Sequence, residues 1–107
     1  MEQTERDART QTIFRAGNEA LRRVAGSRNG AVPFLCECRD ERCFTRIPLT
    51  SAEYEEVRAH PRRFVVARGH EGDERTIALN DGYALVEKDA AAGEIAVETD
   101  PRRRHDA

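Results

Sequence analysis

The sequence predicts a small α+β domain tied together by one metal site, and three observations support this prediction. Two stretches have the apolar periodicity of helices, and several short β-branched runs are typical of strands. Three cysteines lie within eight residues and a Gly-His pair follows downstream. We therefore expect an N-terminal amphipathic helix, a small mixed or antiparallel sheet, one crossing helix and a zinc knuckle at the sheet edge.

The chain of 107 residues has the size of one domain, which we place at residues 12–88. Hydrophobic residues make up 38% of it and charged residues 36%, so a metal cross-link would help so small a core. Residues 1–11 are polar without an apolar period, and we expect a polar N-terminal segment there. Residues 89–107 turn from an alanine run into an arginine run, so a weakly ordered tail is expected.

An amphipathic helix is expected over residues 12–26, ending at Gly26. Arg15 and Glu19 fall on the side opposite its apolar stripe. This stripe either packs on the domain's own sheet or docks on a protein partner. Its residues recur at steps of three and four: Ile13, Phe14, Gly17, Ala20, Leu21 and Val24.

A β-hairpin is predicted around the cysteines. Ala31–Leu35 is a short apolar strand, and Pro33 within it favours a sheet edge because proline donates no ladder hydrogen bond. Residues 39–42 form a charged turn, and 43–47 alternate as a second strand. The tip of this hairpin should carry the three thiols.

The crossing helix has the clearest local signal. Thr50 and Glu53 have the spacing of a capping box, which predicts a helix over residues 51–60 that Pro61 terminates. A strand over residues 63–68 follows.

A second hairpin is predicted over residues 76–86. A two-residue turn would pair Leu79 with Ala84. A three-residue loop with Gly82 in the left-handed region would pair Leu79 with Tyr83 instead, and we expect this register because it buries more apolar surface.

Cys36, Cys38, Cys43 and His70 are the candidate metal ligands, and we expect one zinc ion per chain. Cys36 and Cys38 are two residues apart, so on an extended strand both thiols project to one side. The charged turn returns Cys43 toward them, and Gly69 allows a close backbone approach beside His70. Three thiolates and one imidazole are a common tetrahedral set for structural zinc.

Other interpretations remain open. The thiols can be free buried cysteines or form a redox disulfide with one thiol left over, although charged neighbours argue against an apolar burial site. His60 is a weaker ligand candidate because its position in a last helical turn suits a cationic ring without any metal. His105 lies in the expected tail and is also a poor candidate.

An iron–sulfur cluster is a minority alternative. The two-iron cluster of the CDGSH proteins also uses three cysteines and a histidine and begins with Cys-x-Cys. In this chain Cys43 follows too soon, Phe44 stands after it, and the Pro-x-Cys-Asp-Gly-His sequence is missing. The spacing therefore argues for a single ion.

We expect no enzyme, because the chain has no glycine-rich phosphate loop, nucleophile elbow or His-Glu-x-x-His helix. A net charge of −2 with arginines dispersed among acids argues against nucleic-acid binding. No apolar run approaches a membrane span, and the polar start does not have the pattern of a signal peptide. Clustered cysteines, odd in number, are typical of a reducing compartment, so we expect a cytoplasmic protein.

A series of different short motifs follows in a specific order between about residue 13 and residue 102. They are residues 34–38 with Cys43, 47–50, 53–55, 61–64, 69–71, 81–83, 86–88 and 98–102. With these motifs the chain resembles a group of small actinobacterial proteins described as hypothetical. The resemblance implies a cytosolic bacterial protein whose cysteines and Gly-His pair belong together. In the proteins it resembles, the position of His60 is typically acidic.

The sequence therefore favours a non-enzymatic, zinc-stabilised binding or regulatory module. Its partner is expected to be a protein, reached through the helix face that carries Ile13, Phe14, Leu21 and Val24. The alternatives are a thiol-based redox or metal-responsive switch and, less favoured, a nucleic-acid-binding regulator.

Overall fold

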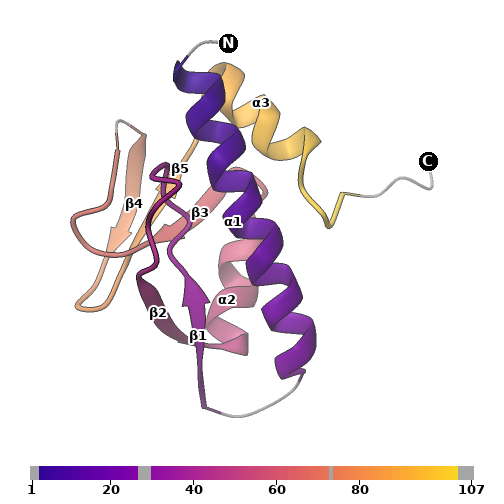
Figure 1. Ribbon diagram of the computed structural model, residues 1–107, viewed down its shortest axis with the longest axis vertical. Helices are drawn as coiled ribbons and strands as arrows, with labels where there is room; N and C mark the ends of the chain where they lie inside the picture. Colours follow the sequence, from indigo (N-terminus) through magenta and orange to yellow (C-terminus); the bar gives the residue numbers. More distant parts are fainter. Residues whose placement is uncertain (1–2, 27–29, 73, 104–107) are drawn as a thin grey trace.

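Three helices and two antiparallel sheets make up the part of the chain that the computed structural model describes, residues 3–26, 30–72 and 74–103 (Figure 1). The α+β class is as predicted, with antiparallel pairing in both sheets. None of the described helices has the length and apolar character needed to cross a membrane. The elements follow in the order α1 (Gln3–Ala25), β1 (Ala31–Leu35), β2 (Arg46–Thr50), α2 (Ser51–Arg58), β3 (Arg63–Val66), β4 (Arg75–Leu79), β5 (Ala84–Glu87) and α3 (Ala90–Glu98).

The first sheet is the predicted hairpin of β1 and β2, and the thiols lie in the connection between these strands. Pro33 pairs with Pro48. Since neither residue has an N–H, neither can donate to a further strand, which protects both edges. The second strand begins at Arg46, later than expected, because residues 43–45 belong to the loop that holds Cys43.

The second sheet has the strand order β3-β5-β4. The predicted three-residue loop between β4 and β5 is wrong, because Leu79 pairs with Ala84 and a bulge at Ile77 follows. The side-chain oxygen of Asn80 accepts from the N–H groups of Gly82 and Tyr83 and closes the shorter turn. Burial had no influence on this register, since β4 is an exposed edge strand.

Helix α2 begins as its sequence predicts. The Thr50 hydroxyl accepts from the Glu53 N–H at 3.1 Å, and the Glu53 carboxylate accepts from the Thr50 N–H at 2.8 Å. The capping box therefore fixes the position at which the chain leaves β2.

Helix α1 starts at Gln3, so the predicted start at residue 12 is wrong, and the polar segment expected over residues 1–11 is helical in its described part; residues 1–2 lie outside the described residues. Side-chain pairs one turn apart support these polar turns, such as the hydrogen bond from Gln3 Nε2 to Asp7 Oδ1 at 2.7 Å. Gly26, at φ 60°, ends the helix as predicted. An apolar period cannot reveal a helix segment that is polar all round.

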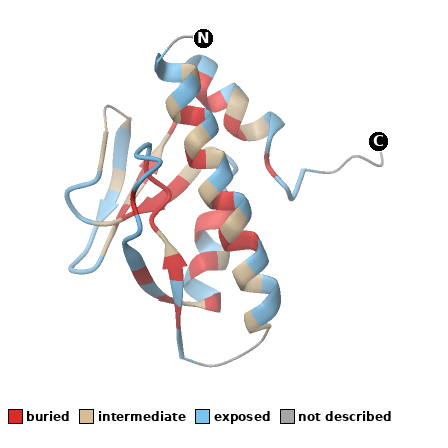
Figure 2. Cartoon of the chain, viewed as in Figure 1, coloured by how far each residue is buried: buried red, intermediate tan, exposed pale blue. Residues whose placement is uncertain are grey.

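The face of α1 that packs on the domain is largely polar. Ile13 and Val24 are 70% and 82% exposed, while Phe14 and Leu21 are half-buried. Of the two alternatives for the apolar stripe, packing on the domain's own sheet is therefore wrong for Ile13 and Val24. The residues of α1 that are buried are Ala8, Gln11, Arg15, Asn18 and Glu19 (Figure 2).

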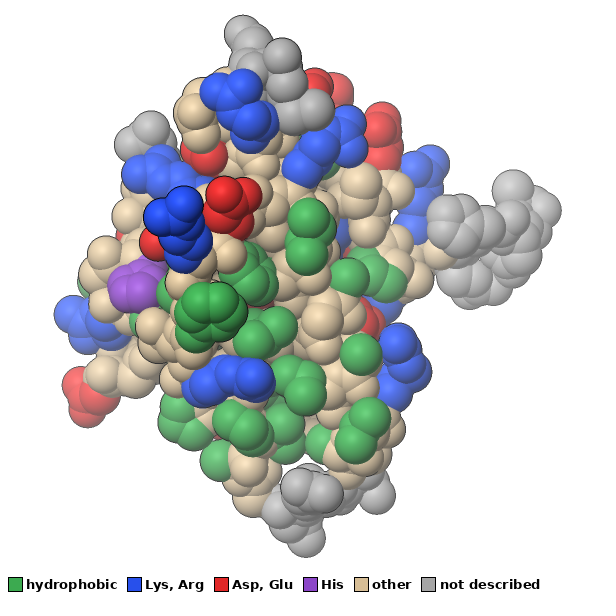
Figure 3. All heavy atoms as spheres, viewed as in Figure 1, with side chains coloured by type: hydrophobic (Ala, Val, Ile, Leu, Met, Phe, Trp, Pro, Cys, Tyr) green, Lys and Arg blue, Asp and Glu red, His purple; other side chains and the backbone are tan. Residues whose placement is uncertain are grey.

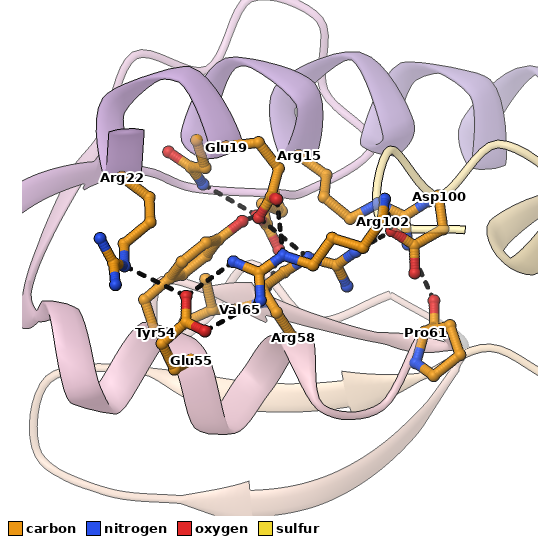
Figure 4. A network of polar contacts seen from close by, with 12 residues as sticks. Arg15, Glu19, Arg22, Tyr54, Glu55, Arg58, Pro61, Val65, Asp100 and Arg102 are labelled. Carbon is orange, nitrogen blue, oxygen red and sulfur yellow. Dashed lines mark hydrogen bonds and ion pairs between the residues drawn. The ribbon is translucent and has the colours of Figure 1, made fainter. Parts of the chain in front are cut away.

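Buried arginines take the place of apolar side chains beneath α1 (Figure 4). Arg15 donates to the carbonyl oxygens of Pro61 at 2.8 Å and Ala96 at 2.7 Å, and its guanidinium lies 4.8 Å from the centre of the Phe64 ring. Burial and the neighbouring Arg58 lower the pKa of Arg15. These hydrogen bonds join α1 to the segments that follow α2 and to α3.

Arg58 of α2 lies at the centre of the second part of this network. Its side chain is fully buried and binds Glu19 at 3.2 Å and also Asp100. Arg102 reaches Glu19 at 2.6 Å and Glu55 at 2.7 Å, and these bonds raise its pKa. The residues beyond α3 are thereby clamped to both α1 and α2 (Figure 4).

The expected weakly ordered tail over residues 89–107 is therefore wrong as far as residue 103; residues 104–107, with His105, lie outside the described residues. Helix α3 packs along α1, and small side chains make this possible. Ala92, Gly93 and Ala96 are buried. A Cβ atom at Gly93 would lie only 2.7 Å from the Lys88 carbonyl oxygen.

Candidate metal centre

The four predicted ligands lie together at one end of the β1–β2 hairpin. Their ligand atoms, the sulfurs of Cys36, Cys38 and Cys43 and a ring nitrogen of His70, all lie within 4.8 Å of one another. The Nδ1 atom of His70 is 3.5 Å from the sulfur of Cys36 and 3.5 Å from that of Cys43. This Cys3His cluster can hold a metal ion.

Each ligand reaches the cluster from the end of a regular element. Cys36 and Cys38 follow β1 directly, and the turn that brings Cys43 back is closed by its N–H, which donates to the Asp40 carbonyl at 2.9 Å. After β3 the chain turns at Gly69, whose φ of 91° lies in the left-handed region that favours glycine. His70 then donates its N–H to Ala67 at 3.0 Å, which fixes the position of its ring.

The sulfurs are buried and the imidazole is exposed. Cys36, Cys38 and Cys43 are 1%, 4% and 8% exposed, and they form no disulfide. A cleft of about 260 Å³ beside the cluster is lined by Cys38, Arg39, Asp40, Gly69, His70 and Glu71. Solvent therefore approaches the cluster from the side of His70.

Backbone groups hydrogen-bond with each of the three sulfurs. The Ala67 N–H donates to the Cys36 sulfur at 3.2 Å, yet burial outweighs this bond and raises the pKa of Cys36. Burial likewise raises the pKa of Cys38, against a backbone hydrogen bond from Asp40.

Cys43 differs from the other two thiols. Burial acts to raise its pKa, but hydrogen bonds from the backbone and side chain of Thr45, with smaller effects from Cys38 and His70, lower it to about 7. Cys43 is therefore the thiol of the three that gives up its proton most readily, which suits a metal-binding thiolate.

Glu37 anchors the ligand loop and was missed by the sequence reasoning, which counted it among charged neighbours that argue against burial. It is fully buried. Its carboxylate accepts from Asn18 Nδ2 at 2.9 Å, from the Tyr54 hydroxyl at 3.0 Å and from the Val65 N–H at 3.0 Å. Burial raises the pKa of Glu37. The available signal was strand alternation, because two thiols on one side send the residue between them to the other.

The backbone of Glu37 also ties the loop to the domain. Its N–H donates to the Val65 carbonyl at 2.8 Å, and its carbonyl accepts from Gln11 Nε2 at 3.0 Å. The loop that holds two of the thiols is therefore bound to α1, α2 and β3 through this one residue.

Replacement of Glu37 by alanine is expected to lower the free energy of unfolding by about 2–3 kcal/mol, because Tyr54 and Val65 lose their buried acceptor. Denaturant unfolding of the metal-loaded protein measures this loss. Glu41→Ala, at an exposed position of the same loop, is the matched control and should change stability little. Equal effects of the two substitutions would show that Glu37 is not an anchor.

Of the other two histidines, only His60 lies within the described residues. His60 is exposed just after α2 and is not among the four clustered residues. Within residues 3–26, 30–72 and 74–103, the Cys3His cluster is the only group of three or more His, Cys, Asp or Glu side chains placed to share one ion. The structure thus selects His70, as the Gly-His motif predicted, over His60.

Comparison of the chain with protein-family models, with curated proteins and with solved structures finds no match. The site must therefore be interpreted from its own chemistry.

Proposed function

We propose that this protein is a non-enzymatic, zinc-stabilised module that binds a protein partner. The observation that carries the proposal is the distance of 3.5 Å from His70 Nδ1 to each of two cysteine sulfurs. A tetrahedral zinc ion with Zn–S of ~2.3 Å and Zn–N of ~2.0 Å places sulfur and nitrogen about 3.5 Å apart. These two nitrogen–sulfur pairs thus stand at the separation that one such ion requires.

Zinc suits the site better than an iron–sulfur cluster. A two-iron cluster divides its four ligands between two metal atoms, which spreads the ligand pairs apart. Four ligand atoms that all lie within 4.8 Å of one another fit a single ion. Three thiolates and one imidazole form a soft tetrahedral set, for which zinc is the usual ion.

The zinc is proposed to be structural. Three thiolates and His70 complete a tetrahedron and leave no open position for a catalytic water. The loop that carries two of the ligands is joined through Glu37 to α1, α2 and β3. Metal bound here would therefore fix the relative position of most elements of the domain.

The partner is proposed to dock on the outward side of α1. Ile13 and Val24 are exposed there, at 70% and 82%. Figure 3 shows hydrophobic side chains gathered over the lower half of α1 and the neighbouring β1–β2 hairpin. An extended apolar face of this kind is typical of a protein-binding surface.

A nucleic acid is a less suitable partner. The net charge is −2, and many arginines face carboxylates within the domain, among them Arg22, Arg58, Arg63, Arg75 and Arg102.

Zinc thiolates require reduced cysteines, which is why we propose a cytoplasmic location.

A redox switch is the second candidate function, and the cleft beside Cys38 and His70 is the observation that favours it. Hydrogen peroxide entering there would oxidise two thiolates to a disulfide, would itself be reduced to water, and would release the ion. A switch loses zinc to mild peroxide far faster than a structural site does, so the rate of zinc release separates the two functions.

Purified protein is expected to contain about one zinc ion per chain, because the four ligands occur once. Elemental analysis and thiol titration after gentle purification measure this. His60→Ala is the control for His70→Ala and should retain its zinc against a competing chelator. Metal-free protein with three freely titratable thiols would contradict the proposal, and visible absorption bands would indicate iron–sulfur.

A further inference from the structure

The outward part of the apolar stripe of α1 points directly away from the domain, while Phe14 and Leu21 of the same stripe are half-buried. At about 100° per residue, Ile13, Ala20 and Val24 fall within about 40° of one another around the helix, and Ala16 lies beside them. All four are exposed. The buried polar residues Gln11, Arg15 and Asn18 occupy the opposite side. No charged side chain interrupts the stripe along this described stretch.

We infer that the occupant of this face is a second copy of the chain, with two α1 helices packed antiparallel about a two-fold axis near residues 18 and 19. This inference specifies the partner in the proposed function and rests on it. The stripe is self-complementary in that register, because Ile13 then faces Val24 of the second copy. Ala16 and Ala20 lie near the axis, where small side chains allow two helices to approach closely.

The available area is sufficient for a stable dimer. The molecule measures 39 × 38 × 24 Å, and Figure 3 views it along the shortest axis, so the apolar surface belongs to one of the two broad faces. Covering half of such a face buries about 700 Å² on each copy, close to the ~800 Å² per partner of a standard interface. Two-fold pairing is also the commonest arrangement of soluble oligomers.

Light scattering on the zinc-loaded 107-residue chain tests the inference. The expected mass is twice the 12.1 kDa of one chain. Ile13→Glu and Val24→Lys should each give a monomer that retains its zinc and its circular dichroism. Leu79→Glu is the matched control, since Leu79 is a 56% exposed apolar residue on β4, and this variant should remain a dimer.

Mixing the Ile13→Glu and Val24→Lys variants tests the register. In the antiparallel pair the introduced carboxylate faces the introduced ammonium, so the mixture should form a mixed dimer; a parallel pair would not restore it. A wild-type monomer, a dimer that survives both single substitutions, or a monomer that binds a different protein through α1 would each overturn the inference. The zinc content of the same samples tests the proposed function separately.

Discussion

Removal of the metal with a chelator is expected to lower the free energy of unfolding by at least about 5 kcal/mol, because binding energy at a structural zinc site is folding energy. Domains of this size have total stabilities of about 5–15 kcal/mol, so the metal-free protein should be largely unfolded or loosened at physiological temperature. Thermal unfolding followed by circular dichroism, before and after chelation, measures the effect. Adding zinc back should restore the transition.

Substitution of single histidines shows how much of this loss of stability depends on the imidazole ligand. His70→Ala leaves three thiolates and should cost a few kcal/mol, since water can take the fourth position. His60→Ala should cost only a few tenths, because His60 is exposed at the end of α2. If the His60 variant proved the less stable one, the choice of imidazole would be wrong. Stability that did not respond to chelation would contradict a structural metal.

Replacement of Arg58 by alanine is expected to lower the free energy of unfolding of the metal-loaded protein by about 3–5 kcal/mol. The guanidinium is fully buried between the carboxylates of Glu19 and Asp100. Its removal takes one cationic partner from both buried carboxylates. Glu19 then keeps the Arg102 guanidinium, whereas Asp100 keeps only a neutral donor from that residue, the Arg102 N–H at 2.9 Å. Denaturant unfolding at constant zinc concentration measures the loss.

Arg68→Ala is the matched control, because Arg68 is exposed and its side chain donates only to the Asn80 carbonyl. That variant should stay within about 0.5 kcal/mol of the original protein. Arg58→Met has the volume of the native side chain without its charge and should also destabilise the domain. Comparable stability of the Arg58→Ala and Arg68→Ala variants would show that the buried network contributes little.

The features that were predicted correctly depend on neighbours in the sequence. The capping box of Thr50 and Glu53 is a contact over three residues, so it fixed the start of α2. The positions of the thiols followed from strand alternation and one short turn. Of the four ligands only His70 is distant in the sequence, and the glycine before it was the signal that indicated its role.

The features that were missed depend on distant partners. Arg15 and Glu19 have the composition of a solvated face, and distant partners, such as Ala96 for Arg15 and Arg102 for Glu19, make their burial favourable. No periodicity contains that information, since a charged side chain is assigned to solvent unless its counter-charge is known. The same holds for α3, whose small residues are buried only because α1 lies against them.

The clamp formed by Asp100 and Arg102 has a consequence for biosynthesis. Helix α1 is made first, yet part of its polar inner face is matched by residues made more than 80 positions later, as in the Glu19–Arg102 pair. Until these residues leave the ribosome, Glu19 can pair with Arg58 but not with Arg102, and Arg15 can reach Pro61 but not Ala96, so the docking of α1 stays incomplete. Such distant contacts slow folding, so the last step should be closure of the C-terminal residues over α1 after translation has passed Arg102.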